Sequence, residues 1–138
     1  MPDVTLSLPY PPSVNHYWNH KAVRSRKTRR WVVLKYLSSR AKSFRTEVEA
    51  RVYEQLGIPP RLKGRLAIIV HQHYGPRDEQ HEHDGPAQDI DNCLKSLFDA
   101  LEHAAVYRND SQIDELLVVK KRRAAIGRVE ITIKTIGE

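Results

Sequence analysis

Residues 66–74 constrain the fold most, because they are apolar on both faces of an extended strand. Apolar side chains fill alternating positions on each side, with Leu66, Ile68 and Val70 on one face and Ala67 and Ile69 on the other. A strand of this kind lies inside a sheet, since a solvent-facing strand keeps one polar face. The segment therefore predicts a central strand, with neighbouring strands beside it and other elements covering the sheet.

Three further strands are indicated, the first and the last of them by alternation of apolar and polar residues. They are predicted over residues 4–8, 116–120 and 129–136. The linker around Gly127 is short enough for a hairpin. We therefore expect the last two strands to be neighbours.

Two helices are predicted between the strands. Residues 31–56 contain neither proline nor glycine, and apolar side chains recur every three or four positions, as in a long amphipathic helix. Residues 90–105 have a similar spacing and predict a second helix. This order of elements predicts an α+β domain in two layers, with two main helices packed against a mixed or antiparallel sheet of about four strands.

Length and composition limit the class of protein. The 138 residues suffice for one domain with a core and are too few for two, so we expect a single domain over residues 1–138. The chain lacks the run of about 18 apolar residues that a membrane helix needs, and its first residues lack the features of a signal peptide. We therefore expect a cytoplasmic protein with no membrane partner. The single cysteine, Cys93, excludes an intrachain disulfide and is expected to pack as a small apolar residue.

Two carboxylates, an amide and an ammonium gather at the predicted start of the second helix, from Asp89, Asp91, Asn92 and Lys95. Mg²⁺ prefers oxygen ligands, usually one or two carboxylates together with water and substrate phosphate. Residues two apart on a helix point in nearly opposite directions, so Asp89 and Asp91 can face one ion only if Asp89 precedes the helix. Asp91 and Lys95 are four apart and are expected to share a face, which would place the ammonium beside a bound phosphate.

Spacing alone leaves two interpretations of this cluster open. In the first, Asp110 returns alongside the helix as a third carboxylate and completes a metal site. In the second, Asp89 only caps the helix and Asp91 forms an exposed ion pair with Lys95, which stabilises the helix slightly.

Histidines offer a competing metal site. His71 and His73 share one strand face, and the long loop of residues 76–87 adds His81 and His83. The chain has no HExxH motif, and one cysteine excludes the usual zinc clusters. Solvated histidines are the simpler interpretation.

A basic segment precedes the first predicted helix. Residues 21–30 contain no acidic residue, and the whole chain carries a net charge of +6, which favours a mobile loop that contacts phosphates. The preceding polar and aromatic residues suit stacking on nucleic acid, although aromatic residues next to a proline turn also commonly pack inside. The candidate DNA-binding residues are Asn15, Tyr17, Trp18, Lys21, Arg24, Arg26, Lys27, Arg29 and Arg30, with Asn92 from the acidic cluster.

Nearly the whole chain resembles the RusA family of Holliday junction resolvases, which are small endodeoxyribonucleases. The resemblance begins at residues 8–17, is strongest at residues 89–95, and continues through residues 98–101 and 110–113. The chain departs from the family pattern at Gln88, where a basic residue is common, at Asn109, where a second acid is frequent, and at Ala105, where glycine is usual. The loop of residues 76–87 is also longer than the family leads us to expect.

The resemblance implies a RusA-like fold and assigns roles to the acidic cluster. The family's catalytic aspartates match Asp89, Asp91 and Asp110, its essential lysine matches Lys95, and its neighbouring asparagine matches Asn92. We expect the aspartates to hold one or two Mg²⁺ ions, with Mn²⁺ as a substitute, for hydrolysis of a phosphodiester bond.

The implied partner is four-way junction DNA, bound by a homodimer that cuts two strands symmetrically during recombination and repair. Two alternatives remain at this stage. The chain could be a branched-DNA-binding module without catalysis, or a nuclease that acts on flaps and forks generally.

Overall fold

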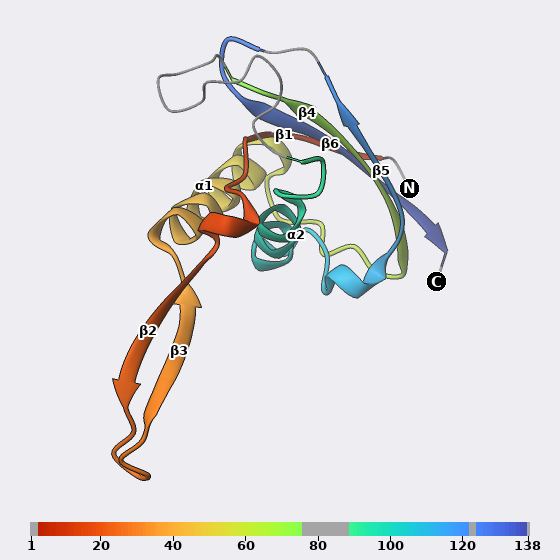
Figure 1. Ribbon diagram of the computed structural model, residues 1–138. Helices are drawn as coiled ribbons and strands as arrows, with labels where there is room; N and C mark the ends of the chain where they lie inside the picture. The colour runs from red at the N-terminus through yellow and green to blue at the C-terminus, as the bar shows by residue number, and fades with distance from the viewer. Residues whose placement is uncertain (1–2, 76–88, 122–123, 138) are drawn as a thin grey trace.

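The predicted central strand is β4 (Arg65–His73), an inner strand of a four-stranded sheet in the computed structural model (Figure 1). Its neighbours are β5 (Ile113–Lys120), which runs parallel to it, and β6 (Arg128–Gly137), which runs antiparallel. β1 (Val4–Pro9) pairs antiparallel with β6 at the other edge. The sheet has the order β1-β6-β4-β5. The α+β class is confirmed, and of the two predicted kinds of sheet, mixed or antiparallel, the mixed one forms.

The structure describes residues 3–75, 89–121 and 124–137. The loop of residues 76–87, with His81 and His83, and the following Gln88 lie outside the described residues, so the predictions made for them stay predictions. Within the described ranges, no helix is long and apolar enough to cross a membrane.

A helical layer covers one face of the sheet. It consists of α1 (Ser39–Leu56) and α2 (Leu94–His103), which pack side by side beneath the strands in Figure 1. The buried stripe of α1 recurs at three- and four-residue spacing and comprises Ala41, Phe44, Val48 and Val52. The predicted two-layer packing therefore forms.

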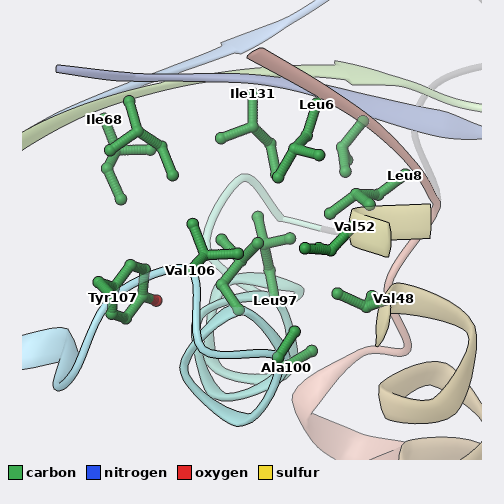
Figure 2. Close-up of a cluster of buried hydrophobic side chains, with 14 of the residues drawn as sticks. Leu6, Leu8, Val48, Val52, Ile68, Leu97, Ala100, Val106, Tyr107 and Ile131 are labelled. Atoms are coloured by element: carbon green, nitrogen blue, oxygen red, sulfur yellow. The ribbon is translucent and has the colours of Figure 1, made fainter. Parts of the chain in front are cut away.

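The core fills the space between the two layers (Figure 2). Burying a large aliphatic side chain stabilises the folded state by about 1.5–3 kcal/mol, so this cluster is the main favourable term in folding. The sheet contributes Leu6, Leu8, Ile68 and Ile131, and the helices contribute Val48, Val52, Leu97 and Ala100, all of them buried.

The predicted hairpin between the last two strands is wrong, because β4 lies between β5 and β6. The chain leaves β4, passes through α2 and enters β5 parallel to β4, as crossover connections usually do. The other edge of β4 still needs backbone hydrogen-bond partners, and β6 supplies them. Pairing with β4 on both sides therefore replaces the local hairpin.

The first helix begins eight residues later than predicted, because Trp31–Leu37 form the strand β3. β-branched and aromatic residues such as Val32, Val33 and Tyr36 favour a strand when a partner is available. The partner is β2 (Trp18–Arg24), which pairs antiparallel with β3. The basic segment is therefore a β-hairpin and its turn rather than a loop, and this hairpin projects from the body of the domain (Figure 1).

Local signals set the ends of α1. Ser38 is its N-cap, and the Ser38 side chain accepts a hydrogen bond from the Ala41 N–H at 3.1 Å. Gly57 ends the helix with a φ of 75°, a conformation that glycine adopts without steric cost. The predicted end of this helix is thus confirmed.

Ala105 follows the end of α2 with a φ of 61°, in the left-handed region. A side chain with a Cβ is strained there by roughly 1–2 kcal/mol, which exceeds the entropic cost of glycine in the unfolded chain. We predict that Ala105→Gly raises the free energy of unfolding by about 0.5–1 kcal/mol. Urea denaturation monitored by circular dichroism measures this change.

The matched control is Ala104→Gly, because Ala104 has an ordinary negative φ of −79° and is buried. That variant should lower the free energy of unfolding by about 1 kcal/mol. A loss of stability in both variants would contradict the strain at Ala105.

Candidate active site

The acidic cluster forms a turn that precedes α2. The Asn92 N–H donates to the Asp89 carbonyl at 3.1 Å, and the Leu94 N–H donates to the Asp91 carbonyl at 3.2 Å. Because α2 begins at Leu94, both aspartates lie outside the regular helix, and both side chains are exposed. The prediction that Asp89 precedes the helix is confirmed, and Asp91 precedes it as well. We call residues 89–92 the acidic turn.

The interpretation of the cluster as an ordinary capped helix is wrong. The N-cap of α2 is Cys93, which makes no side-chain cap hydrogen bond, so Asp89 does not cap the helix. Lys95 pairs with Asp99, one helical turn further on, at 3.2 Å. The expectation that Asp91 and Lys95 share a helical face also fails, because Asp91 precedes the helix. The two aspartates therefore do not have the structural roles that this interpretation gave them.

Two hydrogen bonds hold the acidic turn from opposite sides. The Gln72 side chain, at the end of β4, donates from Nε2 to the Ile90 carbonyl at 2.9 Å. From the other side, the Val14 N–H donates to the Asn92 carbonyl at 2.7 Å. Val14 begins the short 3-10 helix η1 (Val14–His16), which directly follows the predicted proline turn. The backbone of the acidic turn is thus fixed by groups distant in sequence.

Cys93 lies behind the acidic turn with none of its surface exposed. Burial raises the pKa of the Cys93 thiol to about 11, so the thiol is neutral near pH 7. The prediction that Cys93 packs as a small apolar residue is confirmed.

A second polar cluster links the base of the hairpin to both helices. The Tyr17 hydroxyl donates to Asp99 Oδ2 at 2.5 Å and accepts from Arg45 Nη2 at 3.0 Å. Since Asp99 also pairs with Lys95, the lysine is part of the same cluster. Asp99 and Arg45 were not among the predicted site residues. The four-residue spacing of Lys95 and Asp99 was the one sequence signal that could have indicated their ion pair.

Tyr17 is buried, with 1% of its surface exposed. Its ring therefore cannot stack on a DNA base in this structure, and packing is the correct interpretation of this aromatic residue. Burial, reinforced by the hydrogen bond to Asp99, raises the pKa of Tyr17 to about 12. Trp18 is half-buried, packs edge-on against Tyr17, and has the Lys35 ammonium 4.4 Å from its ring centroid.

Asp110 lies near the opposite end of α2. It opens the 3-10 helix η2 (Asp110–Gln112), and its N–H donates to Glu102 Oε1 at 2.9 Å. Leu94 and Glu102 are separated by about 12 Å along the helix axis at 1.5 Å per residue. Within the described part of the chain, no three His, Cys, Asp or Glu side chains are close enough to hold a metal ion. A single chain in this conformation therefore does not gather the three predicted aspartates into one cluster.

The chemistry of the acidic turn nevertheless fits Mg²⁺. Asp89 and Asp91 present exposed carboxylate oxygens around one tight turn, and Mg²⁺ is often bound by only one or two carboxylates with water and substrate phosphate. The histidine alternative gains no support among the described residues, where His73 lies 3.7 Å from Glu130 without a third ligand. The assignment of metal ligands stays a prediction.

The β2–β3 hairpin carries the basic segment on an exposed surface. Lys21 and Arg24 lie on β2, and Arg26, Lys27, Arg29 and Arg30 lie in the turn, all of them exposed. Trp31 pairs across the strands with Arg24 and is 71% exposed. The sequence pattern had placed Trp31 in a helix, so its position on this surface was missed. Asn15 is exposed on η1, next to the residue that binds the acidic turn.

Comparison with known proteins gives one family model and several relatives that carry the same name. The family model described as "Endodeoxyribonuclease RusA" matches residues 9–134. The chain is 30% identical over 133 residues to the crossover junction endodeoxyribonuclease rusA of Enterobacteria phage HK97, covering 96% of this chain and 95% of the relative. The Escherichia coli K12 protein of the same name gives the same identity and coverage. The phage 82 protein is 29% identical over 136 residues, covering 96% of this chain and 94% of the relative.

The Tyr17–Asp99 hydrogen bond predicts a measurable contribution to stability. A hydrogen bond to a charged group contributes roughly 1.5–3 kcal/mol, so we expect Tyr17→Phe to lower the free energy of unfolding by about 2 kcal/mol at pH 7.5. Tyr53→Phe is the control, because Tyr53 is 73% exposed and its hydroxyl should contribute less than about 0.5 kcal/mol. Equal losses in the two variants would contradict the role of the hydrogen bond.

The stability difference between the wild-type protein and Tyr17→Phe should depend on pH. The pKa of Tyr17 is raised from 10.0 to about 12, so its stabilising contribution is complete below pH 10 and is lost as the pH rises to 12. The difference in free energy of unfolding between wild type and Tyr17→Phe should therefore shrink over this range, as measured by urea denaturation.

Proposed function

Because the chain belongs to the RusA family of endodeoxyribonucleases, we propose that it resolves four-way DNA junctions by metal-dependent hydrolysis of phosphodiester bonds, in recombination and repair. The acidic turn carries the proposal: two exposed carboxylates stand in front of α2 on a backbone fixed from both sides. A turn with only a capping role would not need these two anchors from residues distant in sequence.

We assign the metal to Asp89 and Asp91, the two carboxylates of the acidic turn. Asp110 lies near the other end of α2, so its proposed role as a third carboxylate requires a second chain or another conformation that brings it to the turn. Mg²⁺ bound there, or Mn²⁺ in its place, would polarise the scissile phosphate and lower the pKa of an attacking water. Lys95, in the first turn of α2 directly after the acidic turn, stabilises charge on the phosphate. Asn92, which follows Asp91 directly, orients a substrate or ligand oxygen.

The β2–β3 hairpin is the proposed DNA-binding arm. Its exposed guanidinium and ammonium groups contact phosphates, and the neighbouring Trp31 offers an aromatic surface for an unstacked base at the crossover. The hydrogen bonds around Tyr17 connect the base of this arm to α2. DNA held by the arm is thereby placed relative to Lys95 and the acidic turn.

The active form in this proposal is a homodimer. A two-fold dimer brings one acidic turn to each of two symmetry-related strands, which produces the paired cuts that resolve a junction. Cleavage rates on a four-way junction, a fork and a linear duplex at equal salt distinguish this activity from a general nuclease for flaps and forks.

Neutralising one metal ligand should separate chemistry from binding. We predict that Asp91→Asn reduces the rate of junction cleavage at least about a thousandfold, because a carboxylate that holds the metal is lost. Junction binding without metal should persist, as measured by gel shift on a labelled synthetic junction.

Asp114→Asn is the matched control for this variant. Asp114 is an exposed aspartate on β5, paired with Arg65, and lies outside the acidic turn. The Asp114→Asn variant should cleave the junction at nearly the wild-type rate. Cleavage by Asp91→Asn with Mg²⁺ at the wild-type rate would refute the assignment.

Removing charge from the arm should weaken binding in a salt-dependent way. Each phosphate contact contributes about 0.9 to the slope of log K against log salt. We predict that the double variant Arg29→Ala, Arg30→Ala binds the junction about tenfold more weakly at 0.1 M salt and lowers the slope by about 2. Arg51→Ala, on α1 and paired with Glu47, is the control and should change neither quantity. An unchanged slope in the double variant would remove these two residues from the DNA interface.

A further inference from the structure

Gln72 is a polar residue where the pattern of its strand calls for an apolar one. It continues the inward-facing series of β4 after Leu66, Ile68 and Val70, and it is fully buried. Burying an amide costs free energy unless its polar atoms find partners. The hydrogen bonds that Gln72 makes should therefore explain its presence at this position.

The side-chain hydrogen bonds of Gln72 join it to the acidic turn, to Cys93, which follows that turn, and to Tyr74, which follows β4. Nε2 donates to the Ile90 carbonyl at 2.9 Å and lies 3.2 Å from Cys93 Sγ. Oε1 accepts a hydrogen bond from the Tyr74 hydroxyl at 3.3 Å. The amide therefore binds the acidic turn on one side and is itself oriented by Tyr74 on the other.

The Ile90 carbonyl that Gln72 binds directly precedes Asp91 in the chain. It belongs to the peptide unit between Ile90 and Asp91, so fixing it restricts the rotation of the backbone on the N-terminal side of Asp91. The next anchored carbonyl is that of Asn92, on the C-terminal side of Asp91, which accepts from the Val14 N–H. The backbone is thus held on both sides of Asp91 although the turn lies outside the regular helix.

We propose that Gln72 is a positioning residue, whose amide fixes the Ile90 peptide and so sets the direction of the Asp89 and Asp91 carboxylates toward a divalent cation. The expected effect of Gln72 on metal-dependent cleavage rests on the proposed function. Its expected effect on the backbone of the acidic turn rests only on the hydrogen bonds that Gln72 makes. Groups that orient metal ligands commonly change metal affinity by 10- to 100-fold when they are removed.

The test variant is Gln72→Met, which keeps a side chain of similar length and removes both polar atoms. The first readout is independent of activity: the rate at which a disulfide reagent such as DTNB labels Cys93, the only cysteine in the chain. Cys93 is fully buried and directly follows the acidic turn, so its labelling reports local opening of this part of the chain. We expect Gln72→Met to be labelled about tenfold faster than wild type.

Val52→Ala is the control for a general loss of stability. Val52 is a buried core residue of α1, apart from the acidic turn, and its truncation destabilises the whole domain. The free energy of unfolding of each variant is measured, and labelling that occurs through global unfolding is subtracted. The remaining labelling rate of Val52→Ala under native conditions should be about that of wild type. Equal acceleration in both variants would show that Gln72 contributes only to global stability and would overturn the proposal.

The second readout is the Mg²⁺ concentration that gives half-maximal cleavage. We expect this concentration to rise about tenfold in Gln72→Met, while junction binding without metal is unchanged. Gln72→Asn should show the same effects, because its amide is one methylene too short to reach the Ile90 carbonyl. This second variant also provides both readouts if Gln72→Met does not fold.

The outcomes separate this inference from the proposed function. Wild-type labelling and metal dependence in the folded Gln72 variants would overturn the positioning role. If the wild-type protein does not cut junctions with Mg²⁺ or Mn²⁺, the proposed function fails. The labelling comparison then still decides whether Gln72 restrains the acidic turn.

Discussion

The burial of β4 is the constraint on which the rest of the structure depends. An inner strand must have hydrogen-bond partners along both edges, because water cannot reach its backbone. β5 satisfies one edge after the crossover through α2, and β6 satisfies the other. This arrangement places α2 against the sheet and brings the end of β4, with Gln72, to the turn that precedes α2. The position of the acidic residues thus follows from the pairing of the central strand.

Partly buried polar contacts connect the base of the basic hairpin to the helix that carries Lys95. Ser38 binds the His16 carbonyl at 2.5 Å, which joins the start of α1 to the base of the hairpin. Tyr17, Arg45 and Asp99 continue this connection to α2 and Lys95. Such contacts are costly to break when they are buried. The connected groups therefore join the start of the basic hairpin to both helices and to the lysine.

Much of the fold could be predicted from local patterns. Alternation of apolar and polar residues located β1 and β6, short apolar runs located β4 and β5, and the three- to four-residue spacing located most of both helices. The errors occurred where tertiary partners outweighed local preference. Residues 31–37 carry apolar side chains that suit either a helix or a strand, and pairing with β2 decided for the strand. The expected hairpin between β5 and β6 gave way to pairing with β4, which lies far from β6 in sequence.

The sequence by itself determined which chemical groups are present: the carboxylates of residues 89–91, the lysine that follows, and a basic segment free of acids. It also determined the family, since the matched region covers nearly the whole chain. Only the tertiary structure decided that both aspartates precede the helix, that Lys95 pairs with Asp99, and that Tyr17 is buried. It also placed Asp110 beside Glu102 instead of in the acidic turn. The physical reason is that residue spacing fixes directions only within a regular element. The acidic turn lies outside one, and its geometry is set by hydrogen bonds from Gln72 and Val14, which are distant in sequence.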